Sequence, residues 1–104
     1  MPGVVQDTFG YALHLAQTGE KHDASKPLKG FGGASVLEIV ENHDGDTYRA
    51  VYTVRFAESV YVLHVFQKKS KAGVAAPRQD VDLIRARLKL AAEDYAQWQK
   101  QKRP

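Results

Sequence analysis

Apolar residues recur at three- and four-residue steps near the start of the chain, which predicts an amphipathic helix over residues 4–19. Gly19 is a residue type that commonly ends helices. Residues 20–35 carry a cluster of proline and glycine and are predicted to form a loop. The apolar face of the predicted helix consists of Val5, Phe9, Ala12 and Ala16.

Three runs of strand-like residues follow this loop. Residues 36–40 and 47–56 are separated by an Asp-Gly turn within residues 42–46, which is a strong signal for a β-hairpin. A short turn then leads to residues 60–67, whose nearly unbroken apolar character predicts a central strand covered on both faces. Because the connections are too short for crossovers, the meander must be antiparallel.

A second helix is predicted after the loop at residues 70–76. Pro77 stands where the first turn of a helix tolerates proline, and apolar residues then repeat at helical spacing. Residues 99–104 are basic and are predicted to be a frayed tail. At 104 residues, the chain is expected to be a single α+β domain over residues 1–104, with helices packed on a small antiparallel sheet.

Composition removes several classes of function. The sequence has no cysteine, which excludes disulfides, thiol catalysis and Cys-ligated zinc. Its four histidines are scattered without metal-ligand spacing, so we expect no metal site. No apolar run approaches the roughly 20 residues that span a bilayer, and the start does not resemble a secretory signal, so a cytoplasmic protein without membrane contact is expected.

Charge is distributed unevenly along the chain, whose net charge is +3. Residues 1–45 hold three lysines and six acids, whereas residues 46–104 hold twelve lysines and arginines and six acids. A basic half of this kind suggests an anionic partner such as nucleic acid.

Cationic side chains gather around the last two predicted strands. Neighbouring antiparallel strands place the end of one beside the start of the next, so Arg49 should approach the lysines that end the third strand. Cations hold phosphates, rings stack on bases, and the same cations can stabilise the charge that develops when a ribose 2′-hydroxyl attacks its own phosphate. The cations are Arg49, Arg55, Lys68, Lys69, Lys71 and Arg78, with Tyr48 and Tyr52 as candidate stacking rings. RNA binding and RNA cleavage both stay open on these residues.

One histidine, His64, lies inside an apolar strand on the same predicted face as Phe66 and Lys68. It is either a hydrogen-bonded core residue or a proton donor or acceptor near a substrate. Other catalytic arrangements are not supported: no serine occupies a nucleophile elbow, and the acids around the hairpin do not form the pair that glycoside hydrolysis requires.

Four segments together resemble the phage-derived branch of the RelE/HigB toxins. They are KPLKGFGG, VLEIVENHDGDTYRAVY, VYVLHVFQKKSKAG and DLIRARLKLAAEDY, and the resemblance runs from about residue 9 to residue 95. It implies a RelE-like fold with a curved antiparallel sheet, usually completed by a C-terminal pairing or a fourth short strand, so the sheet would have three or four strands. It also implies a metal-independent mRNA interferase of a bacterial type II toxin–antitoxin system, often acting on the ribosome and inhibiting translation and growth. No cofactor is implied, and the partner would be an antitoxin, often a helix-turn-helix protein.

The resemblance assigns roles to individual positions. Arg49 matches a phosphate-contacting arginine of the family, and Lys68 and Lys69 match its basic catalytic residues. Lys71 and His64 are added from their positions alone. Two departures stand out: Glu38 and Val40 occupy a strand where well-known RelE members carry lysines, and the catalytic C-terminal tyrosine has no counterpart except Tyr95, on the apolar stripe of the last helix. The general acid and base are therefore unassigned.

Two other functions compete with this hypothesis. The fold could serve as a non-catalytic module whose basic surface binds RNA or an acidic antitoxin segment, or it could be an inactive prophage remnant. Salt-sensitive RNA binding without cleavage would distinguish the binding module from a nuclease.

Overall fold

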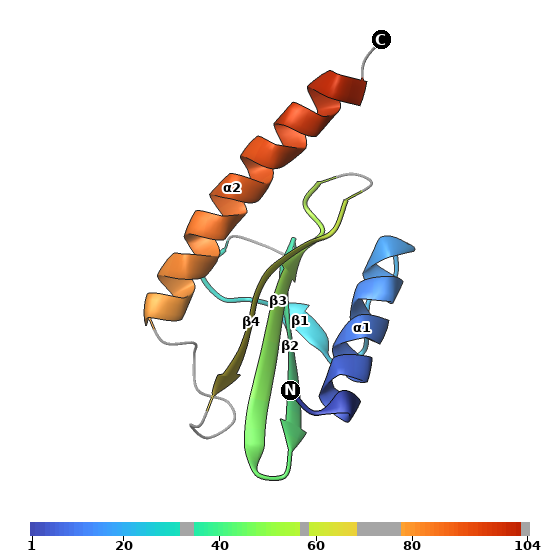
Figure 1. Cartoon of the computed structure of the whole chain (residues 1–104), viewed down its shortest axis with the longest axis vertical. Helices are drawn as coiled ribbons and strands as arrows, with labels where there is room; N and C mark the ends of the chain where they lie inside the picture. The colour runs from blue at the N-terminus through green and yellow to red at the C-terminus, as the bar shows by residue number, and fades with distance from the viewer. Residues whose placement is uncertain (32–34, 57–58, 69–77, 103–104) are drawn as a thin grey trace.

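The computed structural model describes residues 1–31, 35–56, 59–68 and 78–102, of which residues 68 and 102 are described by their backbone only. It confirms the predicted α+β class: a helix, an antiparallel sheet of four strands and a second helix, compatible with a RelE-like fold (Figure 1). The elements are α1 (Gly3–Gln17), β1 (Ser25–Pro27), β2 (Val36–His43), β3 (Asp46–Thr53), β4 (Tyr61–Lys68) and α2 (Arg78–Lys102).

The strands follow the order β1-β2-β3-β4, and each pairs antiparallel with the next. The predicted hairpin is confirmed as β2–β3, and its turn places Asp44 at φ 50 and Gly45 at φ 83. Both central residues of a tight hairpin turn need positive φ, which asparagine, aspartate and glycine tolerate best. The short strand β1 lies within the segment predicted as a loop, and it supplies the fourth strand that the family resemblance allows.

Each face of the sheet is covered by one helix. Because side chains alternate between faces along a strand, the residues of β2 and β3 divide into two separate cores. The core under α1 contains Val5, Phe9, Ala12, Ala16, Leu37, Ile39, Tyr48, Ala50 and Tyr52. The core under α2 contains Leu28, Phe31, Val36, Val51, Leu63, Ile84 and Ala91.

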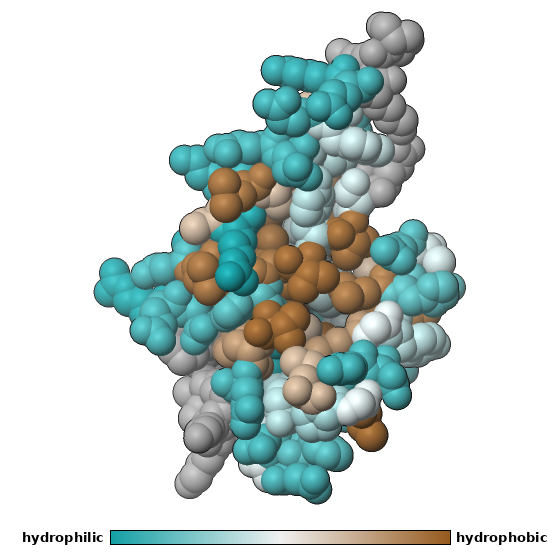
Figure 2. Space-filling model, in the orientation of Figure 1, coloured by the Kyte–Doolittle hydropathy of each residue, from teal (hydrophilic) through white to brown (hydrophobic). Residues whose placement is uncertain are grey.

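The strand β4 is an edge strand, so the prediction of a central strand at residues 60–67 was wrong. A register shift opposite Val51 and Tyr52 turns Leu63 into the core under α2. On the other face Val62 and Val65 are 49% and 41% exposed, because α1 packs mainly on β2. Apolar surface is accordingly visible between the two helices in Figure 2. The continuous apolar run of β4 therefore corresponds to a strand that is buried on one face and exposes apolar side chains on the other.

The helix α2 continues to Lys102, and its last turns extend past the sheet (Figure 1). The expected frayed tail was therefore wrong for residues 99–102, which are helical, while residues 103–104 lie outside the described part of the chain. Straight-chain residues such as lysine and glutamine are good helix formers, so a polar segment can extend a helix without a core to pack on.

Candidate functional site

The backbone register brings the predicted basic site together on the face of the sheet that α2 covers. Arg49 pairs with Phe66, Val51 pairs with His64 and Thr47 pairs with Lys68. Alternate residues share a face, so Arg49, His64, Phe66 and the Cα of Lys68 belong to one surface. The expected proximity of Arg49 and the end of the third predicted strand is present in this register.

Arg49 is buried in an ion pair. Its Nη1 donates to Oε2 of Glu38 at 3.3 Å, across the β2–β3 pairing, and the two residues are 4% and 9% exposed. A carboxylate this close compensates the positive charge that was expected to contact phosphate. Glu38, which the sequence marks as a departure from the resembling toxins, thus has a definite partner in this chain. The first role that the geometry supports for Arg49 is structural.

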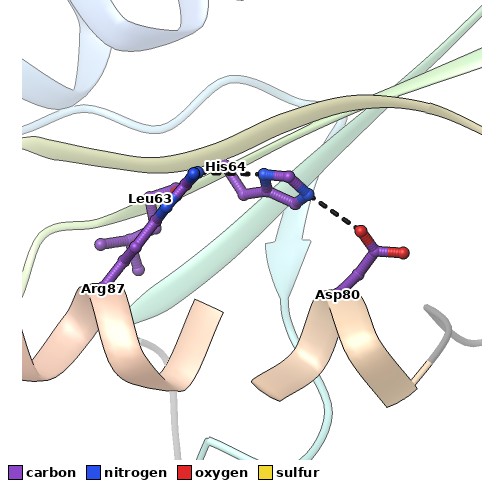
Figure 3. A network of polar contacts seen from close by, with 4 residues as sticks. All are labelled: Leu63, His64, Asp80 and Arg87. Atoms are coloured by element: carbon purple, nitrogen blue, oxygen red, sulfur yellow. Dashed lines mark hydrogen bonds and ion pairs between the residues drawn. The ribbon is translucent and has the colours of Figure 1, made fainter. Parts of the chain in front are cut away.

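The side chain of His64 is held between two residues of α2 (Figure 3). Its Nε2 lies 3.0 Å from Oδ1 of Asp80, and its Nδ1 lies 3.1 Å from Nη1 of Arg87. The same Nη1 donates to the carbonyl oxygen of Leu63 at 2.8 Å. These contacts fasten the first turns of α2 to the edge strand β4.

The partners of His64 determine which of its nitrogens carries the proton. An arginine guanidinium has only donors, so Nδ1 must accept from Arg87 and the proton must reside on Nε2, which donates to Asp80. The ring of Phe66 stacks on the imidazole with 4.6 Å between the centroids and 18° between the planes. Both ring nitrogens of His64 therefore have hydrogen-bond partners, and one face of the ring is covered. To act as a general acid or base, His64 would have to break one of these hydrogen bonds.

The tautomer of His64 is a testable consequence of this network. We expect long-range ¹H–¹⁵N NMR spectra at neutral pH to show the Nε2–H form, because Arg87 can only donate to Nδ1. In Arg87→Met the preference should weaken, whereas Arg85→Met, two residues away on another side of α2, should leave it unchanged. An Nδ1–H tautomer in the unaltered protein would contradict the arrangement.

The two candidate stacking rings lie on the opposite face, in the core under α1. Tyr48 and Tyr52 are buried, and the hydroxyl of Tyr52 donates to Oγ of Ser25 at 2.8 Å. Neither ring has a face open to a base, so the expectation that they stack on RNA is corrected. The cause is the alternation of side chains along β3: residues an odd number of positions from Arg49 point to the other side of the sheet.

Two further predicted cations, Arg55 and Arg78, are exposed to solvent. Arg55 is exposed beyond the end of β3, where its Nε donates to Oγ of Ser35 at 3.2 Å. Six residues of extended chain place it roughly 20 Å from Arg49. Arg78 is exposed at the first residue of α2. Lys69 and Lys71 lie outside the described residues, and Lys68 is placed by its backbone at the end of β4.

Another contact between β4 and α2 involves Tyr61. Its hydroxyl donates to Oδ2 of Asp94 at 2.8 Å. Burial raises the pKa of the Tyr61 phenol, and the hydrogen bond to Asp94, the charge of Asp94 and that of Tyr95 raise it further. Tyr61 therefore stays a hydrogen-bond donor across the physiological range. Tyr95 packs against Phe56 and Trp98, with ring centroids 5.1 and 5.9 Å away, as its place on the apolar stripe predicts.

Sequence reasoning missed Asp80 and Arg87 as partners of His64. From the sequence alone, Asp80 is an acidic residue in the first turn of the second helix, where its charge is favourable. The available signal was the spacing of seven residues between them, which places both side chains on one side of a helix at a separation of roughly two turns. The sequence could not indicate that this side would meet the edge strand.

Two features are absent from the described residues. No group of three or more histidine, aspartate or glutamate side chains comes close enough to hold a metal ion within this part of the chain. Neither of the helices in it combines the length and apolar character needed to cross a membrane.

Comparison with known proteins places the chain in a family. Residues 1–89 match the family described as "Phage derived protein Gp49-like (DUF891)". The match covers most of the chain, so the protein belongs to the Gp49-like family of phage-derived proteins, a family associated with the toxins of toxin–antitoxin systems. Comparison with curated proteins and with solved structures gives no significant match.

Proposed function

We propose that this protein is the toxin of a bacterial type II toxin–antitoxin pair and acts as a metal-independent endoribonuclease on mRNA, with the ribosome as the site of cleavage. The cognate antitoxin, a helix-turn-helix protein in the resembling systems, is its partner, and the cytoplasm is its compartment. Membership of the Gp49-like family over residues 1–89 supports the toxin class. The finer assignment to RelE/HigB nucleases is part of the proposal.

The observation that carries the proposal is the shared sheet face. It holds Arg49, His64 and Phe66, and β4 ends on it at Lys68, from which the basic run of the sequence continues. In this mechanism Lys68 and Lys69 contact the scissile phosphate and stabilise the charge that develops when the 2′-hydroxyl attacks it. Arg49, already compensated by Glu38, positions the strand that carries the lysines.

The direct test is expression of the chain with and without an adjacent antitoxin gene. We expect growth arrest and cleaved transcripts without the antitoxin. The double variant Lys68→Ala/Lys69→Ala should relieve the arrest and lower the rate of cleavage by about 10²–10³-fold, the loss expected when charge-stabilising groups are removed. Mapping of RNA ends in cells and with programmed ribosomes measures both effects.

The matched control removes the same charge elsewhere. Lys21 and Lys100 are exposed, one after α1 and one near the end of α2, so Lys21→Ala/Lys100→Ala should keep full toxicity. Circular dichroism of both double variants checks that they fold. Persistent toxicity of the folded Lys68→Ala/Lys69→Ala protein would refute the site assignment, and normal growth with intact mRNA in the unaltered protein would refute the nuclease.

A second candidate function is a non-catalytic module that binds RNA or the antitoxin. The engagement of Arg49 by Glu38 and of both His64 nitrogens by α2 favours it, because these contacts leave the described part of the face without a ready proton donor or acceptor. It requires RNA affinity that falls steeply with salt and no cleavage on programmed ribosomes. An inactive prophage remnant would show neither cleavage nor such affinity.

A further inference from the structure

A groove on the flank of α2 is not used by the site described above. It is a shallow groove, largely open to solvent, with a volume of about 260 Å³ between α2, the loop before β2 and the chain that leaves β3. The residues that line it are Phe31, Arg55, Arg85, Leu88, Lys89 and Ala92.

Three cations surround this groove, and two of them are held in place. Arg85 donates from Nη2 to the carbonyl oxygen of Gly30 at 2.9 Å, and its guanidinium carbon lies 4.6 Å from the centroid of the Phe31 ring. Arg55 is held by its bond to Ser35. Gly30 has φ +89, and a Cβ there would approach Nη2 of Arg85 to 3.3 Å, so glycine suits both the loop and the arginine.

None of the described residues that line the groove is acidic, and the nearest acids along α2 are Asp82, three residues before Arg85, and Glu93, four residues after Lys89. The ion pairs seen in the described part of the chain join other residues, and none includes Arg55, Arg85 or Lys89. Arg85 and Lys89 are four residues apart, so their like charges lie side by side on the helix, and Asp82 and Glu93 at helical spacing offset only part of this repulsion. A negatively charged ligand would relieve this repulsion.

The floor of the groove is apolar. Leu88 is partly buried against the core under α2, and Ala92 leaves room one turn further along. A volume of about 260 Å³ accommodates one or two aliphatic side chains of a ligand rather than a long apolar helix face. The ligand that fits both features is therefore acidic at its ends and apolar at its centre.

Two observations favour a protein segment over RNA at this groove. Among the described residues that line it, the only aromatic ring is that of Phe31, which is buried and has the Arg85 guanidinium over it. These residues therefore offer no open ring to a base, whereas single-stranded RNA binding relies on stacking of bases on open rings. The groove also lies away from the basic site. Arg85 is about 200° around α2 from Arg87, which contacts His64. An RNA strand bound at the end of β4 would therefore not have to contact this groove.

We propose that this groove binds an acidic segment of a protein partner, with an apolar side chain of that segment in the cavity and its carboxylates paired with Arg55 and Lys89. Arg85, held by its contacts with Gly30 and Phe31, forms the wall of the groove between Arg55 and Lys89. The inference rests on the proposed function only in naming the antitoxin as the source of such a segment. The groove and its charge are independent of any nuclease activity.

The test uses the full chain labelled with ¹⁵N and a fluorescent peptide in which two glutamates flank one leucine on each side. We expect chemical-shift changes centred on Gly30, Arg55 and Lys89. The double variant Arg55→Gln/Lys89→Gln should weaken binding about tenfold, and added salt should weaken it further, because the pairs are exposed. Ala92→Leu, which fills the cavity at an exposed helix position, should also weaken binding.

Matched controls separate this site from general attraction to a basic protein. Lys21→Gln/Lys100→Gln removes the same charge and should retain full affinity, and peptides with glutamine for glutamate or alanine for leucine should bind about tenfold more weakly. A uridine oligonucleotide serves as the RNA arm. Absence of peptide binding, equal binding to the Arg55→Gln/Lys89→Gln variant, or displacement of the peptide from these residues by the oligonucleotide would overturn the proposal. Toxicity of the same variant, measured separately, reports on the nuclease and not on the groove.

Discussion

Replacement of Arg49 by methionine is expected to lower the free energy of unfolding by about 3–5 kcal/mol, because it leaves the buried carboxylate of Glu38 without its partner. Methionine keeps the length and apolar character of the arginine stem, so the lost charge dominates the effect. For a domain of this size, we expect the Tm to fall by more than about 10 °C, measured by calorimetry or by circular dichroism.

The control for Arg49→Met removes both charges. A well-packed apolar pair is often as stable as a buried ion pair, so Arg49→Met/Glu38→Leu should regain most of the lost stability. The single change Glu38→Leu should destabilise the protein for the reciprocal reason. Equal stability of Arg49→Met and the unaltered protein would show that the ion pair does not hold in solution.

The same double variant decides between two roles of Arg49. If Arg49 only positions the strand, a folded Arg49→Met/Glu38→Leu protein should keep most of its toxicity. If its guanidinium contacts phosphate, toxicity should disappear although the fold is restored. The burial of Arg49 and its distance of 3.3 Å from Glu38 favour the first outcome.

Replacement of Ile84 by alanine should destabilise the protein by about 2–5 kcal/mol, the usual cost of removing a buried aliphatic side chain and leaving a cavity. Ile84 is fully buried in the core under α2, and it is the anchor of that helix between the contacts at Asp80 and Arg87. Chemical denaturation measures the loss. Hydrogen exchange should show α2 opening before the β2–β3 hairpin.

The matched control for Ile84→Ala is Leu90→Ala on the same helix. Leu90 is 61% exposed, so its truncation should change stability by no more than about 0.5 kcal/mol. Both variants introduce alanine, so the change in helix propensity is similar in the two. A comparable loss in both variants would mean that α2 is not docked on β4 in the way described.

Elements with a strong local signal were predicted well. The periodic apolar face of α1, the Asp-Gly turn of the β2–β3 hairpin and the long stripe of α2 each depend on residues a few positions apart, and each is present. The short strand β1 gave no such signal, because three residues are too few to show an alternation. Its place is decided by pairing with β2, from Ser25↔Ile39 to Pro27↔Leu37.

For the candidate site, the sequence determined the list of cations and the structure determined their surroundings. Strand alternation placed His64 and Lys68 on one face, as expected, and the register brought Arg49 beside them. The same alternation placed Tyr48 and Tyr52 in the opposite core. In the sequence, Tyr48 and Tyr52 resemble rings that could stack on bases. The sequence does not show that a helix covers the side of the sheet on which they lie.

Local periodicity, turn chemistry and charge are properties of neighbouring residues, so the sequence by itself determined the helices, the hairpin and the basic second half of this protein. Only the tertiary structure decided that β4 is an edge strand, that Glu38 compensates Arg49 and that Arg55 meets Arg85 and Lys89 in one groove. Those contacts join residues 11 to 34 positions apart. They form when the helices bury their apolar faces on the sheet. Because the hydrophobic effect depends on buried apolar area and not on direction, the sequence pattern does not indicate which polar side chains this burial brings together.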